Sequence, residues 1–428
     1  MRVLLVGSGG REHALAWALA RSPLLGELHA APGNPGIGTL ARLHPVAVSD
    51  LEGLTRLAAD LAADLVVIGP EAPLVAGLAD RMAAAGIAAF GPSAAAAQLE
   101  GSKAFAKTVM DAAGVPTARF AVCDTVTAAQ AAIAETDGDV VVKADGLAAG
   151  KGVVVCSSTA EAHAAVAAAL VDGRFGVAGR RVLIEERLEG EELSLLALCD
   201  GERVLPLAPA RDYKRVGDND SGPNTGGMGS ISPVPGIGPD VVADIVARVH
   251  KPVVNELARR GSPFRGCLYA GLILTADGPR VIEFNVRFGD PETQVILPRM
   301  AGDLLALLAR AAGGSLAGCD AEVAEAACVS VVVASRGYPE SPELGDRIGG
   351  IDTAEEIEGV TVFHAGTALG EAGLEAAGGR VLNVTAVGPD FDTARRRAYE
   401  GVDAIRIDGS HHRSDIGRAA RDAERVHA

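Results

Sequence analysis

Apolar and polar positions follow a regular order over the first hundred residues. Residues 2–6 and 65–70 are short apolar runs of strand length, whereas 72–85 and 93–113 carry the wider apolar spacing of helices. A glycine turn joins the first run to an amphipathic helix at about 11–21. Strands that alternate with helices in this way predict an α/β unit built on a doubly wound parallel sheet.

The pattern changes after about residue 115. Two apolar strands, 139–144 and 151–156, are separated by a glycine-rich connection. An alanine-rich helix at 159–171 and a further strand at 181–186 follow. This part predicts a small mixed α/β lobe rather than a repeat of the first unit.

Two strand-rich regions, 193–210 and 267–286, come next. Asp277-Gly278 lies between two apolar runs of the second region and predicts a hairpin. The stretch 217–235 is rich in Gly, Pro, Ser, Asn and Asp, which predicts a long irregular loop. Loops of this kind inside compact domains are often functional.

The last hundred residues predict a further unit. A helix near 303–312 precedes it, and strands are expected at 328–334 and 380–387. A chain of 428 residues is too long for one ordinary hydrophobic core, so two to four domains are expected. Hydrophobic residues make up 48% and aromatic residues only 3%. Small apolar side chains pack helices closely on sheets, which again favours α/β architecture.

Charge and cysteine usage narrow the class of protein. The formal net charge is −16 and no run of Lys and Arg offsets it, so nucleic acid and anionic membranes are not expected as partners. Six cysteines without a Cys-x-x-Cys pair indicate reduced thiols. The first residues do not read as a signal peptide, and no apolar run approaches the roughly 18 residues of a membrane span. A soluble, cytoplasmic protein is expected.

The first glycine turn, GSGGREHA at 7–14, has two interpretations. Free N–H groups at a helix start can bind a phosphate, but any doubly wound sheet also needs a tight turn here. A dinucleotide site is disfavoured because Glu12 replaces the third glycine of that pattern. The second strand moreover ends in PGNPG, at 32–36, with no acid to hold a ribose.

Lys143 closes an apolar strand, and the loop ADGLAAGKG follows at 144–152. Lys151 could reach phosphates, but the spacing departs from the Walker pattern and a strand follows in place of a helix. The loop is compatible with a flap over ATP and equally with a glycine-rich hairpin. The acidic segment IEERLEGEE, at 184–192, is undecided between a functional strand and a solvated turn.

The strongest local signal is RVIEFNVRFGDPETQ at 280–294. Because side chains alternate along a strand, Glu283, Asn285 and Arg287 should share one face, opposite Ile282 and Phe284. Carboxylate and amide oxygens suit Mg²⁺ shared with phosphates, and a guanidinium can grip a carboxylate or phosphate at two points. An ordinary polar strand face is the alternative, but Asn and Glu are poor strand residues.

A second charged segment, ARDYKRVGDND at 210–220, precedes the glycine-rich SGPNTGGMGS at 221–230. Alternating acids and bases alone are compatible with a solvated face. Together with the loop that follows, the segment becomes a candidate for binding substrate.

These motifs together resemble one known family, the phosphoribosylamine–glycine ligases (glycinamide ribonucleotide synthetases) of the ATP-grasp superfamily. The resemblance extends over essentially the whole chain, and RFGDPETQ at 287–294 is its most specific block. The other matching blocks are GSGGREHA, GPEAPLVAGLAD (69–80), LEGSKAFAK (99–107), VVKADGLAAGKGVVV (141–155), ARDYKRVGDND, PNTGGMGS (223–230), FHAGT (363–367) and RVLNVTAVG (380–388).

The resemblance implies an ATP-grasp fold, with ATP between the small lobe and the domain after it. It also implies ligation of glycine to 5-phosphoribosylamine through glycyl phosphate, giving glycinamide ribonucleotide, ADP and phosphate in the second step of de novo purine biosynthesis. ATP and Mg²⁺ or Mn²⁺ are the implied cofactors, acting in a monomer or weak dimer. The domains implied are 1–102, 103–190 with a mobile lobe at about 120–190, 191–325 with the metal and substrate site, and a C-terminal 326–428.

The resemblance also assigns residues. Arg287 and Asp212 are expected to grip glycine, with Lys214 nearby, and Glu283 and Asn285 to bind the metal. Lys103 and Lys143 are expected on the ATP phosphates, Glu185 and Leu188 at the adenine and Glu192 at the ribose. The further expected ATP contacts are Gly150, Lys151, Gly152 and Glu186. The expected substrate contacts are Gly9, Gly10, Arg11, Glu12, Asn34, Pro35, Gly36, Gly226, Gly227, Gly289, Asp290 and Pro291.

One departure from the wider superfamily concerns the metal. Relatives often place a second metal-binding acid on the strand before Glu283, but CLYAGLILT at 267–275 contains none. A second metal on that strand is therefore doubtful. The chain ends soon after SDIGRAA at 414–420, so the enzymes fused to this ligase in animals are not expected.

Three other functions remain to be distinguished. A sister ligase of purine synthesis would use formate or bicarbonate in place of glycine. A nucleotide-binding regulatory protein would bind ATP without turnover. A nicotinamide-dependent dehydrogenase is weakest, given Glu12 and the missing ribose acid.

Overall fold

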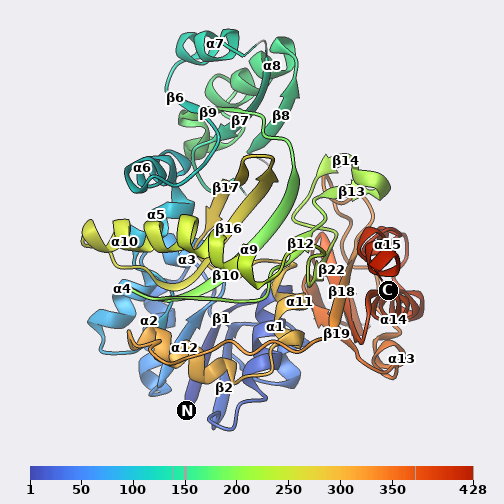
Figure 1. Ribbon diagram of the computed structural model, residues 1–428. Helices are drawn as coiled ribbons and strands as arrows, with labels where there is room; N and C mark the ends of the chain where they lie inside the picture. The colour runs from blue at the N-terminus through green and yellow to red at the C-terminus, as the bar shows by residue number, and fades with distance from the viewer. Residues whose placement is uncertain (137, 149–151, 372, 428) are drawn as a thin grey trace.

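The computed structural model describes residues 1–136, 138–148, 152–371 and 373–427. Figure 1 shows an N-terminal α/β unit at the bottom and a small lobe at the top, with a central sheet between them. The C-terminal unit packs beside the central sheet. The predicted α/β architecture is confirmed.

The N-terminal unit is a five-stranded parallel sheet in the order β3-β2-β1-β4-β5. Leu4 and Val6 of β1 face one hydrophobic core and Val3 and Leu5 face another, so both faces of the sheet are covered. The elements are β1 (Arg2–Gly7), α1 (Gly10–Leu19), β2 (Glu27–Pro32), β3 (Arg42–Leu43), α2 (Leu51–Asp60), β4 (Leu65–Ile68) and β5 (Ala89–Phe90).

Each of the two long helices expected in this region is broken into two. Helices α3 (Glu71–Val75) and α4 (Leu78–Ala84) are separated because Gly77 has φ +88°, a left-handed conformation. Helices α5 (Ala94–Gly101) and α6 (Lys103–Ala113) meet at Ser102, whose hydroxyl accepts a hydrogen bond from the Phe105 N–H at 3.1 Å. An N-cap side chain of this kind starts a new helix.

The small lobe is a four-stranded antiparallel sheet in the order β6-β9-β7-β8 with its own core. The predicted mixed lobe is therefore present, and the described part of the glycine loop joins β7 to β8. The elements are β6 (Phe120–Cys123), α7 (Val126–Ala134), β7 (Asp139–Ala144), β8 (Val153–Ser157), α8 (Thr159–Leu170) and β9 (Val182–Glu186).

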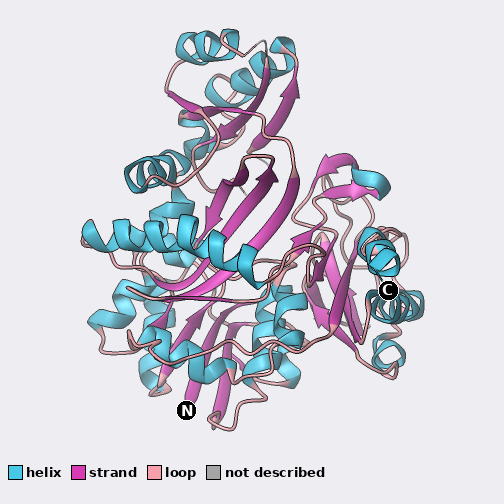
Figure 2. Cartoon of the chain, in the orientation of Figure 1, coloured by secondary structure: helices cyan, strands magenta, loops and turns pink. Residues whose placement is uncertain are grey.

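The central sheet is antiparallel, in the order β11-β10-β16-β17, and shares one hydrophobic core with the N-terminal unit. The helical run from α9 to α10 crosses one face of it (Figure 2). The elements are β10 (Glu191–Asp200), β11 (Val204–Pro206), α9 (Pro239–Ile245), a π-helical turn (Val246–His250), α10 (Lys251–Arg259), β16 (Arg265–Thr275), β17 (Gly278–Asn285), α11 (Thr293–Ile296) and α12 (Leu304–Ala312).

A β-bulge modifies the alternation expected along β17. Strands β16 and β17 pair Gly271 with Glu283 and then Leu272 with Val281, so Ile282 is an extra residue. Val281 is fully buried, whereas Ile282 is partly exposed and lines the cavity described below. The expectation that Ile282 points away from the face of Glu283 was wrong: both residues line the cavity, because a bulge shifts the register by one residue.

The C-terminal sheet has the order β12-β15-β18-β22-β19 and recruits strands from the middle of the chain. The region 217–235, expected as an irregular loop, instead contains β14 and β15, because β15 gains a partner in β18. The elements are β12 (Arg211–Asp212), β13 (Arg215–Gly217), β14 (Ser221–Asn224), β15 (Gly229–Ser232), β18 (Ala327–Ala334), α13 (Ile351–Glu355), β19 (Val360–His364), β20 (Thr367–Gly370), β21 (Gly373–Ala376), β22 (Arg380–Gly388), α14 (Phe391–Ala404) and α15 (Arg418–His427).

Two properties of the chain as a whole bear on its class. Among the described residues, none of the helices combines the length and the apolar character that crossing a membrane requires. All six cysteines are free thiols, and five of them are buried.

Candidate active site

A cavity of about 370 Å³ lies where the four units meet. Its wall includes Arg11 from the first turn, Lys103 at the start of α6, Glu185 on β9 and Arg380 on β22. The predicted residues that line it are Arg11, Lys103, Gly152, Glu185, Asp212, Lys214, Gly226, Glu283, Asn285, Arg287 and Asp290.

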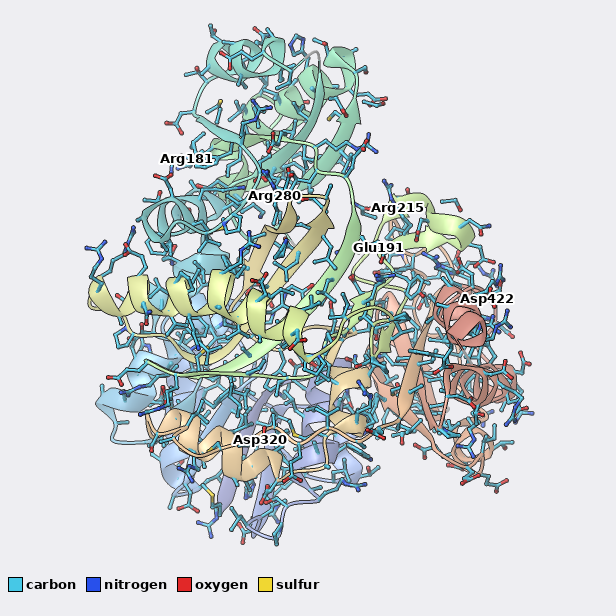
Figure 3. All side chains as sticks on the ribbon, viewed as in Figure 1. Arg181, Glu191, Arg215, Arg280, Asp320 and Asp422 are labelled. Atoms are coloured by element: carbon cyan, nitrogen blue, oxygen red, sulfur yellow. The ribbon has the colours of Figure 1, made fainter. Side chains whose placement is uncertain are left out.

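The other predicted residues lie outside this wall. Gly150 and Lys151 are outside the residues that the structure describes. Glu186 pairs with Arg119 at 2.7 Å and with Arg280 at 3.4 Å, and Arg280 is labelled in Figure 3. The described predicted residues that do not line the cavity are Gly9, Gly10, Glu12, Asn34, Pro35, Gly36, Lys143, Glu186, Leu188, Glu192, Gly227, Gly289 and Pro291.

Glu283 is the carboxylate around which the cations of the cavity gather. Within the described residues, no hydrogen bond or ion pair engages its oxygens, so they are available to a cation. Burial alone would raise the pKa of the Glu283 carboxyl. The opposing effect of four positive side chains is larger, so the pKa lies below its ordinary value. These side chains are Lys214, Lys143, Lys103 and Arg287. The Glu283 carboxylate is thus ionised and near several cations but not paired with any of them. Such a carboxylate is suited to bind Mg²⁺, which it would share with phosphate oxygens.

Asn285 is the second predicted metal ligand, and its side-chain oxygen is partly engaged. The Arg287 guanidinium donates to Asn285 Oδ1 at 3.0 Å. An amide oxygen has two lone pairs, so one remains for a metal ion. The donor set at this end of β17 therefore fits a hard, oxygen-seeking cation.

The Arg287 guanidinium is held on every side. It lies 3.1 Å from Glu71 Oε2 and 3.0 Å from Glu100 Oε1, and it donates to the Phe288 carbonyl at 3.2 Å. Burial alone would lower the pKa of Arg287, but the carboxylates of Glu100 and Glu71 raise it by more. The net pKa is above its ordinary value, so this side chain stays protonated. A cation fixed in this way presents a defined face to the cavity.

Glu71 and Glu100 were not among the predicted residues. Burial alone would raise the pKa of the Glu71 carboxyl, but the charges of Arg287 and Arg11 outweigh burial and lower the pKa to about 2. Burial raises the pKa of the Glu100 carboxyl. Both acids fall within the matching blocks 69–80 and 99–107, but no local spacing marks them as partners of an arginine two hundred residues away.

A buried ion triad joins the lobe to α6. Glu185 Oε2 lies 3.0 Å from Lys107 Nζ and 3.1 Å from Lys143 Nζ, and Lys143 also donates to the Ile282 carbonyl at 2.9 Å. All three charged side chains are almost fully buried. Lys107, in the middle of α6, was missed because a lysine on a helix usually faces solvent. Lys143, predicted on phosphates, bonds to Glu185 in this structure.

The start of α6 is tied to the base of the glycine loop. Asp145 Oδ1 accepts hydrogen bonds from the Ala104 N–H at 2.8 Å and from the Ser102 hydroxyl at 3.0 Å. Lys103 Nζ donates to the Gly146 carbonyl at 3.2 Å. Burial lowers the pKa of Lys103, so its ammonium is poorly solvated and suited to an anionic ligand.

Lys214 lies between two carboxylates at another side of the cavity. Its Nζ is 3.3 Å from Asp212 Oδ1 and also contacts Glu192. Burial alone would lower the pKa of Lys214, but Asp212 and Glu192 outweigh burial and raise the pKa above its ordinary value, so the lysine stays charged. Glu192, predicted at the ribose, is therefore engaged with Lys214.

A carboxyl that the sequence reading missed lies beside this group. Glu292 Oε1 accepts hydrogen bonds from Tyr269 at 3.1 Å and from Ser194 at 3.2 Å, and those two hydroxyls lie 3.0 Å apart. Burial, together with Asp212, raises the pKa of Glu292 to about 7. The residue belongs to RFGDPETQ, which could have indicated it.

The first glycine turn builds its own supports. Glu12 accepts from the Gly9 N–H at 2.6 Å and pairs with Arg11 at 2.7 Å, so it closes the start of α1. Asn34 donates to the Ser8 carbonyl at 2.8 Å and to the His364 carbonyl at 3.0 Å. These two predicted substrate residues are therefore engaged within the protein.

Asp290 connects that turn to the C-terminal unit. Its carboxylate accepts from the Arg11 N–H at 3.2 Å and lies 3.1 Å from Arg380 Nη1. Arg380 also donates to the Gly226 carbonyl at 2.6 Å. Arg380 was not predicted, and it gives this end of the cavity a positive charge.

A platform built on Arg413 holds the segment that carries Asp212 and Lys214. The Arg413 guanidinium is paired with Asp415 at 2.7 Å and with Asp220 at 2.7 Å, and it lies 5.0 Å from the centre of the Tyr213 ring. If Asp212 grips glycine, as the resemblance implies, Arg413→Met should raise the KM for glycine about tenfold with kcat within about twofold, because displaced side chains bind poorly.

Steady-state kinetics with glycine varied would check the Arg413 prediction. Arg418→Met removes an exposed arginine of the same segment and should leave the KM unchanged. Equal losses of activity in both variants, or a fall in kcat alone, would contradict a role of Arg413 in positioning the segment that carries Asp212 and Lys214.

The chain matches three family models in succession. They are the N domain of phosphoribosylglycinamide synthetase over residues 1–100, its ATP-grasp (A) domain over 101–293 and its C domain over 328–419. A biotin carboxylase domain from Hydrogenobacter thermophilus has the same fold, with a TM-score of 0.72 at 20% identity over 96% of this chain and 91% of that chain. The fold and the charged cavity at the domain junction thus define an ATP-grasp enzyme.

More similar proteins identify the family. The chain is 49% identical to phosphoribosylamine–glycine ligase of Brucella melitensis over 100% of both chains, and 52% identical to that of Streptomyces coelicolor over 99% of this chain and 100% of the relative. The crystal structure of the Thermotoga maritima ligase superposes with a TM-score of 0.86, at 35% identity over 97% of this chain and 100% of that one. The chain belongs to the phosphoribosylamine–glycine ligase family and has that ATP-dependent ligase activity in purine biosynthesis.

Proposed function

We propose that the cavity joins glycine to 5-phosphoribosylamine in two steps. The glycine carboxylate attacks the γ-phosphoryl group of ATP, giving glycyl phosphate and ADP. The amine of phosphoribosylamine then attacks the acyl carbon, and phosphate leaves. The observation that carries this proposal is the cluster of four cations around Glu283, because phosphoryl transfer depends mainly on positioning and charge neutralisation.

Glu283 and Asn285 are the residues that would hold a divalent metal ion. Both lie on the cavity wall and offer free oxygen lone pairs. A metal ion there, Mg²⁺ or Mn²⁺, supplies neutralisation of phosphate charge. Strand β16 offers no second acid at 267–275, so one protein-held ion is expected from this face.

The ATP phosphates are assigned to the lysine side of the cavity. Lys103 is poorly solvated and lies at the base of the glycine loop. Lys143 bonds to the carbonyl of Ile282, one residue from the metal-binding carboxylate. The adenine is assigned to the segment around Glu185 and Leu188, between the lobe and the central sheet. The glycine-rich segment 146–152, of which 149–151 lie outside the described residues, was expected to exclude water from the acyl phosphate, and that role stays a proposal.

The two remaining substrates are assigned to the opposite side. Arg287 would bind the glycine carboxylate and Asp212 its amine, since the two side chains line the same cavity with opposite charges. Phosphoribosylamine is assigned to the first turn near Arg11 and Asp290, where Arg380 supplies a further cation. A monomer or weak dimer is the assembly expected for this enzyme.

Phosphate release from purified protein tests this assignment. MgATP, glycine and freshly generated phosphoribosylamine are supplied together, and then each is omitted in turn. Release that needs all three, with glycinamide ribonucleotide identified by its mass, is expected. Release that continues without glycine but needs formate or bicarbonate would overturn the substrate assignment.

A further inference from the structure

We propose that Glu292 is the group that accepts the proton of the attacking amine when the amide bond forms. The inference rests on the two-step reaction proposed above and adds a catalytic residue to it. When the amine nitrogen bonds to the acyl carbon, the nitrogen becomes positively charged. The C–O bond to phosphate then breaks, phosphate leaves, and one N–H proton must pass to a base before a neutral amide remains.

The position of Glu292 suits this step. Its side chain lines the cavity although the residue as a whole is only 3% exposed. Oε1 is held by Tyr269 and Ser194, whose hydroxyls come from strands β16 and β10. Among the described residues, no other residue is hydrogen-bonded to Oε2. Two side chains thus fix the carboxyl through Oε1, its own backbone N–H adds a further hydrogen bond, and lone pairs remain to take up a proton.

Glu292 is surrounded by charged and titratable groups but forms no ion pair with any of the described residues. The charged and titratable groups that face it are Tyr269 on β16, Asp212 on β12, Lys214 after that strand and Arg287 after β17. No cation lies within ion-pair distance of Glu292 in the described structure. Burial is therefore the main cause that raises the pKa of Glu292 to about 7. A base is most effective when its pKa lies near the working pH.

The other acids of the cavity are less suited to this step. Glu283 is surrounded by four cations and is assigned to the metal ion. Asp212 is paired with Lys214, and Glu71 is paired with Arg287. Asp290 is paired with Arg380. Among the described residues, the side chains that are hydrogen-bonded to Glu292 are both neutral hydroxyls.

Glu292→Gln is the variant that tests the proposal. The amide keeps an oxygen for Tyr269 and Ser194 but cannot take up a proton at neutral pH. The full reaction is compared with glycine hydroxamate formation from MgATP, glycine and hydroxylamine, because hydroxylamine captures acyl phosphates without a protein base. We expect amide formation to fall at least about 100-fold, while hydroxamate formation stays within about threefold of the wild type.

The pH profile supplies a second readout. The base must be ionised, so the wild-type rate of amide formation should fall as the pH drops below about 7. Glu292→Gln should lack that dependence. Glu256→Gln, on α10 and bonded to Arg259 and Arg260, serves as a matched Glu-to-Gln control and should keep the wild-type profile.

The outcomes separate this inference from the reaction on which it rests. Absence of glycine hydroxamate with the wild type would overturn the glycyl phosphate step itself. Hydroxamate formed by the wild type but lost in Glu292→Gln would show that Glu292 serves glycine binding or structure, and would overturn the proton-acceptor role. Retention of both activities in Glu292→Gln would overturn it equally.

Discussion

Replacing Arg287 with alanine is expected to reduce kcat/KM for glycine by about 10²- to 10³-fold. The substitution removes the fixed guanidinium assigned to the glycine carboxylate. It also leaves Glu71 and Glu100 without their shared partner, and these two carboxylates then repel an anionic substrate. Both effects act on glycine, so ATP binding should change much less.

Isothermal titration of MgATP and steady-state kinetics with glycine varied would check this result. Arg280→Ala removes an arginine of β17 that is 30% exposed and outside the cavity wall, and should keep wild-type kinetics. A variant that turns over normally at low glycine concentration would rule out the role of Arg287. Loss of ATP affinity equal to the loss of glycine affinity would point to general disruption of the site.

Much of the arrangement at β17 follows from local sequence. Glu283 and Asn285 are two residues apart on β17, and strand geometry brings them to one face. Arg287 follows just beyond the strand and donates to Asn285 Oδ1. The parallel N-terminal sheet was predictable for a similar reason, because alternating apolar and amphipathic segments specify strand and helix locally. The blocks that resemble the ligase family supplied the arrangement of the domains.

The partners of those residues could not be predicted from spacing. Glu71 meets Arg287 across 216 positions, and Asn34 reaches His364 across 330. Such pairs are fixed by how the domains dock, and nothing in the neighbouring residues records it. Strand β15 was missed for the same reason: glycines and serines lack strand propensity, and pairing with β18 supplies the order.

Glu185→Leu is expected to be the most destabilising single substitution at the site, by about 3–5 kcal/mol. Glu185 neutralises Lys107 and Lys143, and all three side chains are at most 3% exposed. Without the carboxylate, two ammonium groups are buried close together with no counter-charge. The matched change Glu191→Leu removes a carboxylate of β10 that is 71% exposed, so we expect an effect within about 0.5 kcal/mol.

The pH dependence distinguishes charge from packing as the cause. Burial already lowers the pKa of Lys107, and loss of Glu185 removes an interaction that raises it. A buried lysine whose pKa is lowered in the folded state destabilises the fold at any pH where the lysine is protonated. This free-energy cost falls as the pH rises toward the ordinary pKa of lysine, because the folded protein can then hold the lysine uncharged. The instability of Glu185→Leu should therefore shrink in alkaline solution. Because a chain of several domains need not unfold in one step, hydrogen exchange in β7 and β9 is the appropriate measurement. Instability that is the same at neutral and alkaline pH would mean that lost packing, rather than two unpaired lysines, is responsible.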